Sequence, residues 1–114
     1  MSFLKRKRLW ENALVPATAT TYYTAPVGTE TQIIAISAIN TDASASYTIE
    51  LYHNESGGAS AAKDQVIKVT LGPNEARTFF HGFVLNTGDF ISALSSSASK
   101  IALHGYGVEL TQGG

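Results

Sequence analysis

Hydrophobic and polar residues alternate in short runs along most of the chain, as they do in β-strands, whose successive side chains point to opposite faces of a sheet. The clearest run is 65–71, in which Ile67, Val69 and Leu71 alternate with polar residues. Helical periodicity is nearly absent. The pattern predicts strands at 20–24, 31–40, 47–53, 65–71, 76–80, 90–94 and 100–110.

Clusters of turn-forming residues separate these runs. Pro26 and Gly28, the Gly-Pro-Asn-Glu segment at 72–75 and the Asn-Thr-Gly-Asp segment at 86–89 all favour turns. About seven or eight short strands with regular turns predict an all-β fold, a single antiparallel β-sandwich that is either jelly-roll or immunoglobulin-like. The chain has no cysteine, so the Cys-Trp-Cys spacing of true immunoglobulin domains is missing. We therefore favour the jelly roll, and the alternative stays open.

The last predicted strand changes its hydrophobic phase. Ile101 and Leu103 share one parity, whereas the apolar residues of 106–110 share the other. We expect both sets to face inward, with a β-bulge or a close backbone approach at Gly105 or Gly107 to absorb the change.

Charge is scarce and unevenly placed. Charged residues make up 15% of the chain, below the usual share of about 25%. A weakly charged surface costs little to desolvate, so it suits packing against neighbours. Four of the eight cations are consecutive, at 5–8, and the other four are outnumbered by nine acids, a net charge of −5 for the rest of the chain. We therefore expect an extended basic N-terminal arm at 1–14 and the β-sandwich domain at 15–114.

The basic arm is the sharpest functional feature, because apolar residues frame its charges. We predict that it docks on an acidic or apolar groove of a neighbouring chain. The predicted partner-binding residues are Phe3, Lys5, Arg6, Lys7, Arg8 and Trp10. The alternatives are phosphate contacts with nucleic acid, which we disfavour, a nuclear localisation patch and a solvated tail.

Motifs for catalysis are missing from the sequence, which has no GxSxG, HExxH, P-loop or GxGxxG. His53, His81 and His104 lie far apart, at no metal-ligand spacing. We expect no enzyme, no catalytic residue, no metal and no cofactor, and a hydrolase site assembled from a histidine and an acid is the enzymatic alternative. The sequence has neither an apolar run long enough to span a membrane nor a signal-peptide pattern.

Adjacent aromatic residues point to opposite faces of a strand, so one member of a pair is a candidate for exposure. Tyr22 and Tyr23 are the candidate exposed aromatics at an interface, and Phe79 and Phe80 form a second pair. Exposed tyrosines also fit a carbohydrate-binding module, which is the alternative function of another class.

Four segments resemble small β-sandwich virion proteins of tailed bacteriophages, and the similarity covers about residues 18–110. They are TTYYTAPVG at 20–28, the isoleucine-rich strand at 31–40, VTLGPNE at 69–75 and VLNTGDFI at 84–91. The resemblance implies a capsid decoration or cement protein, or a neck, tail or head-fibre component. It further implies a place in the virion, the major capsid protein or another virion protein as partner, oligomerisation, and no catalytic residues.

Overall fold

The computed structural model describes residues 2–58, 61–80, 82 and 84–112, without the side chains of Ser2, Phe3, Ala62 and Gln112. His81, one of the three histidines considered above, lies outside the described residues. The elements are β1 (Ser2–Arg8), β2 (Ala13–Leu14), β3 (Thr20–Thr24), β4 (Thr29–Asn40), β5 (Tyr47–Asn54), the 3-10 helix η1 (Ala62–Asp64), β6 (Gln65–Leu71), β7 (Ala76–Phe79), β8 (Val84–Leu85), β9 (Phe90–Ser95) and β10 (Ile101–Gln112).

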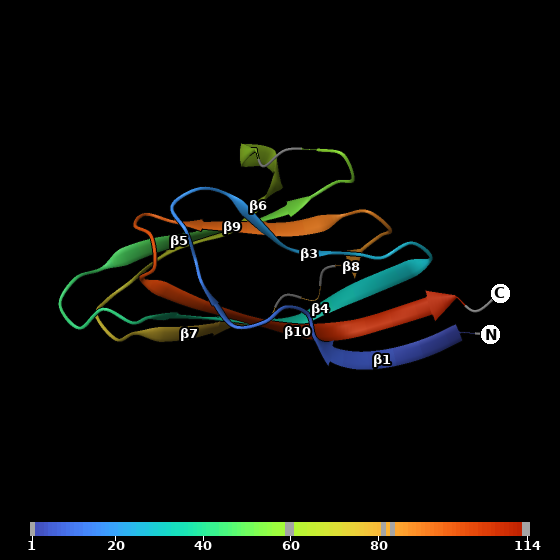
Figure 1. Cartoon of the computed structure of the whole chain (residues 1–114), viewed down its shortest axis with the longest axis horizontal. Helices are drawn as coiled ribbons and strands as arrows, with labels where there is room; N and C mark the ends of the chain where they lie inside the picture. The colour runs from blue at the N-terminus through green and yellow to red at the C-terminus, as the bar shows by residue number, and fades with distance from the viewer. Residues whose placement is uncertain (1, 59–60, 81, 83, 113–114) are drawn as a thin grey trace.

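The strands form two packed sheets, which confirms the predicted all-β sandwich (Figure 1). The first sheet has the order β1-β10-β4-β7, with β2 also paired to β10 and β8 also paired to β4. The second sheet has the order β3-β9-β5-β6. Every pairing is antiparallel.

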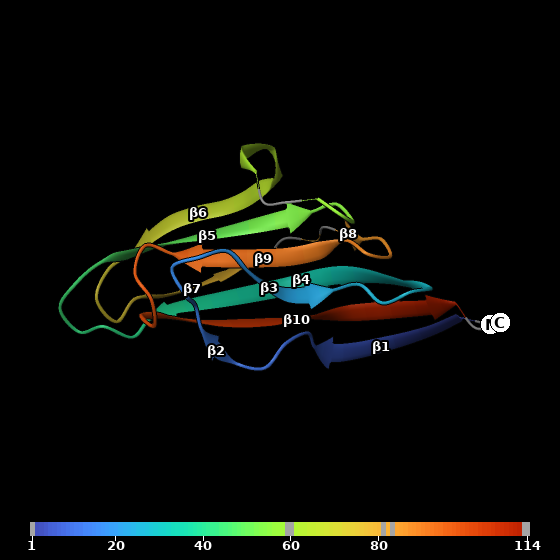
Figure 2. The ribbon, with the colours of Figure 1, turned by 45° about the horizontal axis from the view of Figure 1, so that its top comes forward.

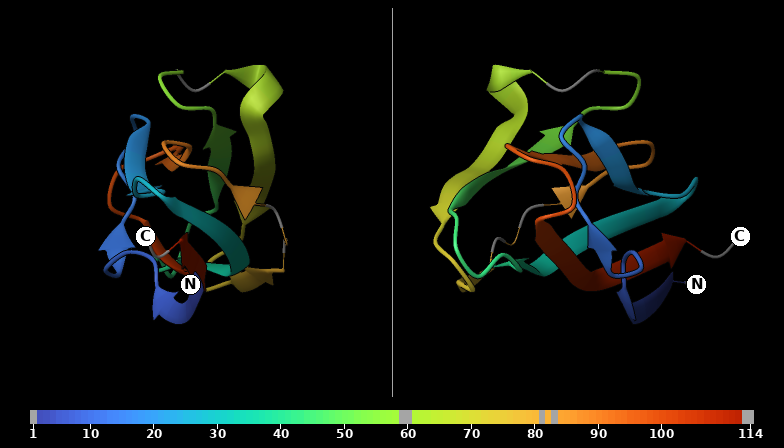
Figure 3. Two further views of the ribbon diagram at one scale, coloured as in Figure 1. Left: turned by 90° about the vertical axis from the view of Figure 1, so that its right-hand side faces the viewer. Right: turned by 60° about the vertical axis from the view of Figure 1, so that its left-hand side comes forward.

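The topology decides between the two predicted sandwich types. The pairs β1–β10, β3–β9, β4–β7 and β5–β6 are nested, so that the first strand pairs with the last and so on inward. This order arises when a long antiparallel hairpin, with its tip between β5 and β6, is rolled into two sheets. A sandwich with this topology is a jelly roll. Because the first and last strands pair, Ser2 lies opposite Gln112, and β1 runs beside β10 (Figures 2 and 3).

All seven predicted strands are present, with ends that differ by up to two residues. The sequence pattern missed β1, β2 and β8. Each of the last two has two residues, too few for an alternation to be visible, and β1 is dominated by charges. Residues 2–8 and 13–14 of the expected arm are therefore extended, as predicted, but they add two strands to the edge of the first sheet.

The core lies between the two sheets and is built from aliphatic side chains of both. Burying one such side chain stabilises the fold by about 1.5–3 kcal/mol. The largest fully buried aliphatic residues are Val15, Ile33, Ile36, Ile49, Leu51, Leu71, Leu85, Ile91, Ile101 and Leu103.

The expected change of phase in β10 does not occur, because the irregularity is taken up by β4. Tyr106 pairs with Ala35 and Gly107 with Ile33, which leaves Ile34 as the extra residue of a bulge on β4. The odd-numbered residues of β10 from 101 to 109 are all buried. The prediction of an irregularity near Gly107 is confirmed, but the prediction that Tyr106 faces inward is wrong.

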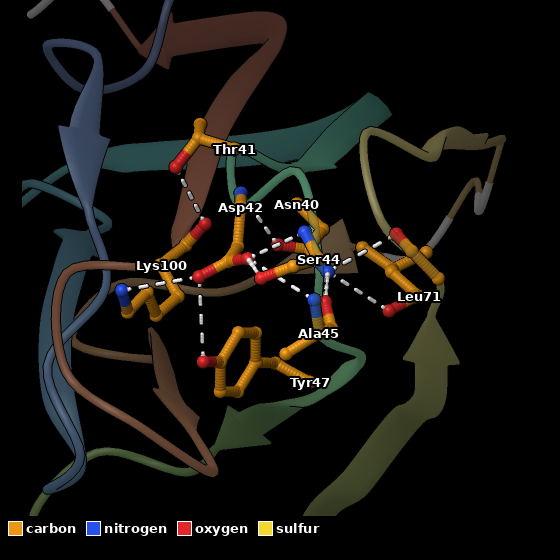
Figure 4. A network of polar contacts seen from close by, with 9 residues as sticks. Asn40, Thr41, Asp42, Ser44, Ala45, Tyr47, Leu71 and Lys100 are labelled. Atoms are coloured by element: carbon orange, nitrogen blue, oxygen red, sulfur yellow. Dashed lines mark hydrogen bonds and ion pairs between the residues drawn. The ribbon is translucent and has the colours of Figure 1, made fainter.

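The connection from β4 to β5 is held by Asn40, which is fully buried (Figure 4). Its Nδ2 donates to the carbonyl oxygens of Ala45, Leu71 and Gly72 at 2.8, 3.1 and 3.0 Å. Its Oδ1 accepts a hydrogen bond from the backbone N–H of Asp42 at 2.9 Å. One amide side chain therefore ties the end of a strand in the first sheet to β6 in the second.

Asp42 caps the same connection (Figure 4). Its Oδ1 accepts backbone hydrogen bonds from Ser44 at 2.8 Å and Ala45 at 3.0 Å, and its Oδ2 lies 3.2 Å from Lys100 Nζ. The hydrogen bond from the Ser44 backbone, followed by that from Lys100, lowers the pKa of Asp42 well below its usual range. The carboxylate therefore stays ionised and holds the turn.

Candidate functional site: the cationic edge strand

Strand β1 is an edge strand that carries positive charge on both of its faces. It runs antiparallel to β10 from Ser2 opposite Gln112 to Arg8 opposite Tyr106. Opposite residues of an antiparallel pair project to the same side of the sheet. Arg6 and Arg8 therefore lie on the outer face, while Lys5 and Lys7 lie on the face that looks toward the second sheet.

Lys7 ties the edge strand to a buried polar cluster. Its Nζ lies 3.5 Å from Glu109 Oε2, and Glu109 is only 8% exposed. Tyr23 Oη donates to the same Oε2 at 2.5 Å and lies 2.7 Å from Thr31 Oγ1. Burial, followed by the hydrogen bond to Glu109, raises the pKa of Tyr23 well above its usual value. A cation and a hydroxyl donor thus compensate the buried carboxylate.

Trp10 anchors the segment after β1 in the chain's own core. It is 7% exposed, and its Nε1 donates to the carbonyl oxygen of Leu103 at 3.2 Å. Its ring lies against Gly105, where an added Cβ would overlap the indole. The ring of Tyr22 packs on it with centroids 5.7 Å apart. In this structure Trp10 is therefore an internal anchor and not a side chain offered to a partner, which corrects the expectation for this residue.

Three cations of β1 remain available. Lys5, Arg6 and Arg8 are exposed, and none of them forms an ion pair with any residue that the structure describes. For Phe3, only the backbone, which pairs with Thr111, is described. Within the predicted set, the structure thus separates Lys7 and Trp10, which hold β1 in place, from Lys5, Arg6 and Arg8, which are exposed to solvent.

A groove with apolar side chains borders these cations on the outer face of the first sheet. Its volume is about 510 Å³. Tyr106 beside it is 47% exposed, and Leu4 on the same face is 75% exposed. The groove is lined by Arg6, Lys7, Ile34, Tyr106, Gly107 and Val108.

The candidate exposed tyrosines lie on the inner side of the fold. Tyr23 is 7% exposed, and Tyr22 is half-buried against Trp10. This corrects the expectation that one of Tyr22 and Tyr23 is exposed at an interface, and it removes the main support for a carbohydrate-binding module. The second pair behaves as expected: Phe79 packs on the core, and Phe80 is 75% exposed.

Sequence reasoning missed Glu109 and Tyr106 as parts of the site. The sequence pattern predicts that Glu109 faces outward, because it predicts that the apolar residues at 106, 108 and 110 face the core. Continuing the alternation of Ile101 and Leu103 through Gly105 and Gly107 would have placed Glu109 on the inward face. This continuation is hard to see in the sequence, because a glycine has no side chain that indicates which face it occupies.

The described residues do not bring together a metal site or a membrane span. No group of three His, Asp or Glu residues among them could hold a metal ion. His104 pairs with Asn12 at 2.8 Å, and His53 lies 3.9 Å from Asp89, on separate parts of the fold. Of the helices in the described part of the chain, none is long and apolar enough to cross a membrane.

Fold and surface together define a class: a jelly-roll β-sandwich whose first strand is a cationic edge. No protein-family model matches the sequence, and no curated protein matches it either. Solved structures do share the fold. A chain from the disulfide-linked pili of Bacillus endospore appendages is similar at a TM-score of 0.55 and 17% identity, over 99% of this chain and 92% of that one.

Two viral structures are similar as well. A chain of infectious bursal disease virus, Gx strain, has a TM-score of 0.56 and 11% identity, over 100% of this chain but 34% of that one, so this chain spans about a third of it. The coat protein of Tobacco streak virus, in its dimer structure, has a TM-score of 0.50 and 12% identity, over 99% of this chain and 87% of that one. At these identities the likeness shows the fold alone.

Proposed function

We propose that the chain is a structural protein of a bacteriophage virion, where it decorates or cements the capsid through protein–protein contacts. Its partner is the major capsid protein or another virion protein, and it works as a homo-oligomer. The observation that carries the proposal is a jelly-roll sandwich whose exposed features are a row of unneutralised cations and a neighbouring apolar groove. Such a surface is suited to docking.

Two further observations support this role. Segments at 20–40, 69–75 and 84–91 resemble small virion proteins of tailed phages. The fold also occurs in a coat protein and in a pilus chain, which are proteins of assembled particles and filaments. Large exposed apolar residues (Leu4, Leu14, Val27, Phe80, Val84 and Tyr106) leave surface that an assembly would cover.

The test is to express the chain with an epitope tag in cells that carry its gene, to induce particles and to purify them on density gradients. Quantitative mass spectrometry then gives the copy number per particle. We expect the chain to co-purify with particles in hundreds of copies. Particles that form normally and contain none of the chain would overturn the proposal.

The likeness to a pilus chain favours one alternative, a component of the tail, neck or head fibre. Neck and tail rings contain few copies because their symmetry is low. A copy number near six or twelve, with labelling by antibody at one vertex, would replace the capsid role by this one.

A further inference from the structure

The outer margin of β1 has unused hydrogen-bonding capacity. Among the residues that the structure describes, β1 pairs only with β10, and it lies at the margin of the first sheet in Figures 1 and 2. In an antiparallel ladder, alternate residues direct their N–H and C=O groups to the partner strand, so the remaining residues of an edge strand direct theirs outward. Over the seven residues of β1, this is a template for one more strand.

The charges on β1 select what can pair there. A second copy of β1 would bring Lys and Arg side chains against one another, and like charges opposite each other destabilise a strand pair. The positive charge therefore disfavours pairing of β1 with the β1 strand of a second copy of the chain. The same charges attract an acidic strand, since no described residue neutralises Lys5, Arg6 or Arg8.

The spacing of the cations on β1 predicts where acidic residues lie in a partner strand. Arg6 and Arg8 are two residues apart and face the same side of the sheet, the side that bears the groove with Tyr106 and Val108. A strand laid along β1 places every second side chain on that side. Acidic residues at alternate positions would then meet both arginines, and guanidinium–carboxylate pairs favour this close geometry.

We propose that β1 binds an extended, acidic segment of a partner protein by strand addition, with acidic side chains at every second position facing Arg6 and Arg8. This inference rests on the proposed assembly function and names how the partner is held. Main-chain hydrogen bonds supply affinity, and the cations supply selectivity for acidic strands.

The first experiment measures binding of a capped peptide, Glu-Thr-Glu-Val-Glu-Thr-Glu, by fluorescence anisotropy and by amide exchange. We expect saturable binding that weakens with salt, together with slower exchange of β1 amides that point away from β10. Variant K5Q/R6Q/R8Q should bind roughly tenfold more weakly. It leaves Lys7 and Trp10 intact, so the fold is kept. The matched control K63Q/K68Q/R77Q loses the same charge elsewhere and should bind as the wild type does.

A second peptide separates strand addition from simple charge attraction. The same sequence with N-methyl groups at alternate residues keeps every charge but cannot donate along one edge. We expect its binding to be lost. Equal binding of both peptides, or no loss in K5Q/R6Q/R8Q, would overturn the proposal. Tighter binding of a single-stranded DNA oligonucleotide, lost in K5Q/R6Q/R8Q, would replace it by nucleic-acid recognition.

The experiments can overturn the virion role and the acidic-strand site independently of each other. Particles that take up K5Q/R6Q/R8Q as well as the wild type would overturn strand addition as the mode of attachment and leave the virion role standing. A chain that binds the acidic peptide as described but never enters particles would overturn the virion role and leave the acidic-strand site standing.

Discussion

Two glycines in β10 set how closely other backbone and ring atoms can approach that strand. An added Cβ would overlap the Trp10 indole at Gly105, and the backbone carbonyl of Gln32 at Gly107. Both glycines are buried, and neither has a positive φ, so a left-handed backbone conformation is not the reason for glycine at these positions. Their role is to leave room, at one position for the anchor of the edge strand and at the other for the bulge in β4.

Substituting Gly105 by Ala tests the anchor. The methyl group would displace Trp10, and we expect a loss of about 1–3 kcal/mol of unfolding free energy, the range for overpacked cores. Gly72→Ala is the matched control, because a Cβ there meets Glu75 Oε1 at an ordinary 3.6 Å. Urea denaturation followed by tryptophan fluorescence gives both values. Equal midpoints for the two variants would contradict the close packing.

Tyr23 makes stability depend on pH on the alkaline side. The pKa of the folded-state phenol is raised above the unfolded value of 10.0, so its contribution is present below pH 10 and is lost as the pH rises above it. At neutral pH, Tyr23→Phe should cost about 1.5–3 kcal/mol, because Glu109 loses a donor. Its stability should then fall less steeply above pH 10 than that of the wild type.

Tyr106→Phe is the control for the alkaline experiment, since the ring of Tyr106 is 47% exposed on the outer face. Thermal unfolding between pH 8 and 11 should give parallel curves for Tyr106→Phe and the wild type. If Tyr23→Phe also followed the wild-type curve, the buried phenol would not be the group responsible.

At the scale of elements, the turn between β4 and β5 shows how polar side chains fix a crossing between sheets. Asn40→Ala leaves three carbonyl oxygens without their donor and removes the acceptor for Asp42. We expect a loss of about 4 kcal/mol, near 1 kcal/mol for each of the four hydrogen bonds. Asn12→Ala, which changes an exposed pair with His104, should cost far less. Chemical denaturation of both variants compares them directly.

Asp42 makes the stability of the fold depend on pH on the acidic side, through the same turn. Its folded-state pKa lies below the unfolded value of 3.8, so the stability it contributes is present above about pH 4 and is lost as the pH falls further. We expect the melting temperature of the wild type to drop between pH 5 and 2. Asp42→Asn should be less stable at pH 7, with a smaller drop. Identical acid profiles would show that other carboxylates control this transition.

At the scale of the molecule, β1 and β10 join the two ends of the chain, so the N-terminal segment is part of the fold. Deleting residues 1–12 removes β1, leaves Glu109 buried without Lys7, and takes Trp10 out of the core. Loss of Trp10 alone should cost about 3–5 kcal/mol. We expect the truncated chain to unfold or aggregate, whereas K5Q/R6Q/R8Q keeps the β-sheet circular dichroism spectrum. A truncated chain as stable as the wild type would contradict this assignment.

The strands and turns were readable from the sequence for local reasons. Most of the seven predicted strands alternate or are largely apolar over five or more residues, and the turns at 72–75 and 86–89 carry residues suited to them. Asn74 and Gly88 there adopt positive φ of 58° and 87°. The site was readable only in part. Runs of charge mark Lys5, Arg6 and Arg8, but nothing local distinguishes them from Lys7.

The sequence by itself therefore determined the all-β sandwich, the turn positions and the cationic character of residues 5–8, because period-two patterning and turn chemistry act over a few residues. Tertiary structure alone decided that β1 pairs with β10, that Trp10 fills the space at Gly105, and that Glu109 is buried. These contacts join residues about ninety or more positions apart or depend on which strand lies beside which. Alternation along one strand tells which side chains share a face, but not which neighbour that face meets.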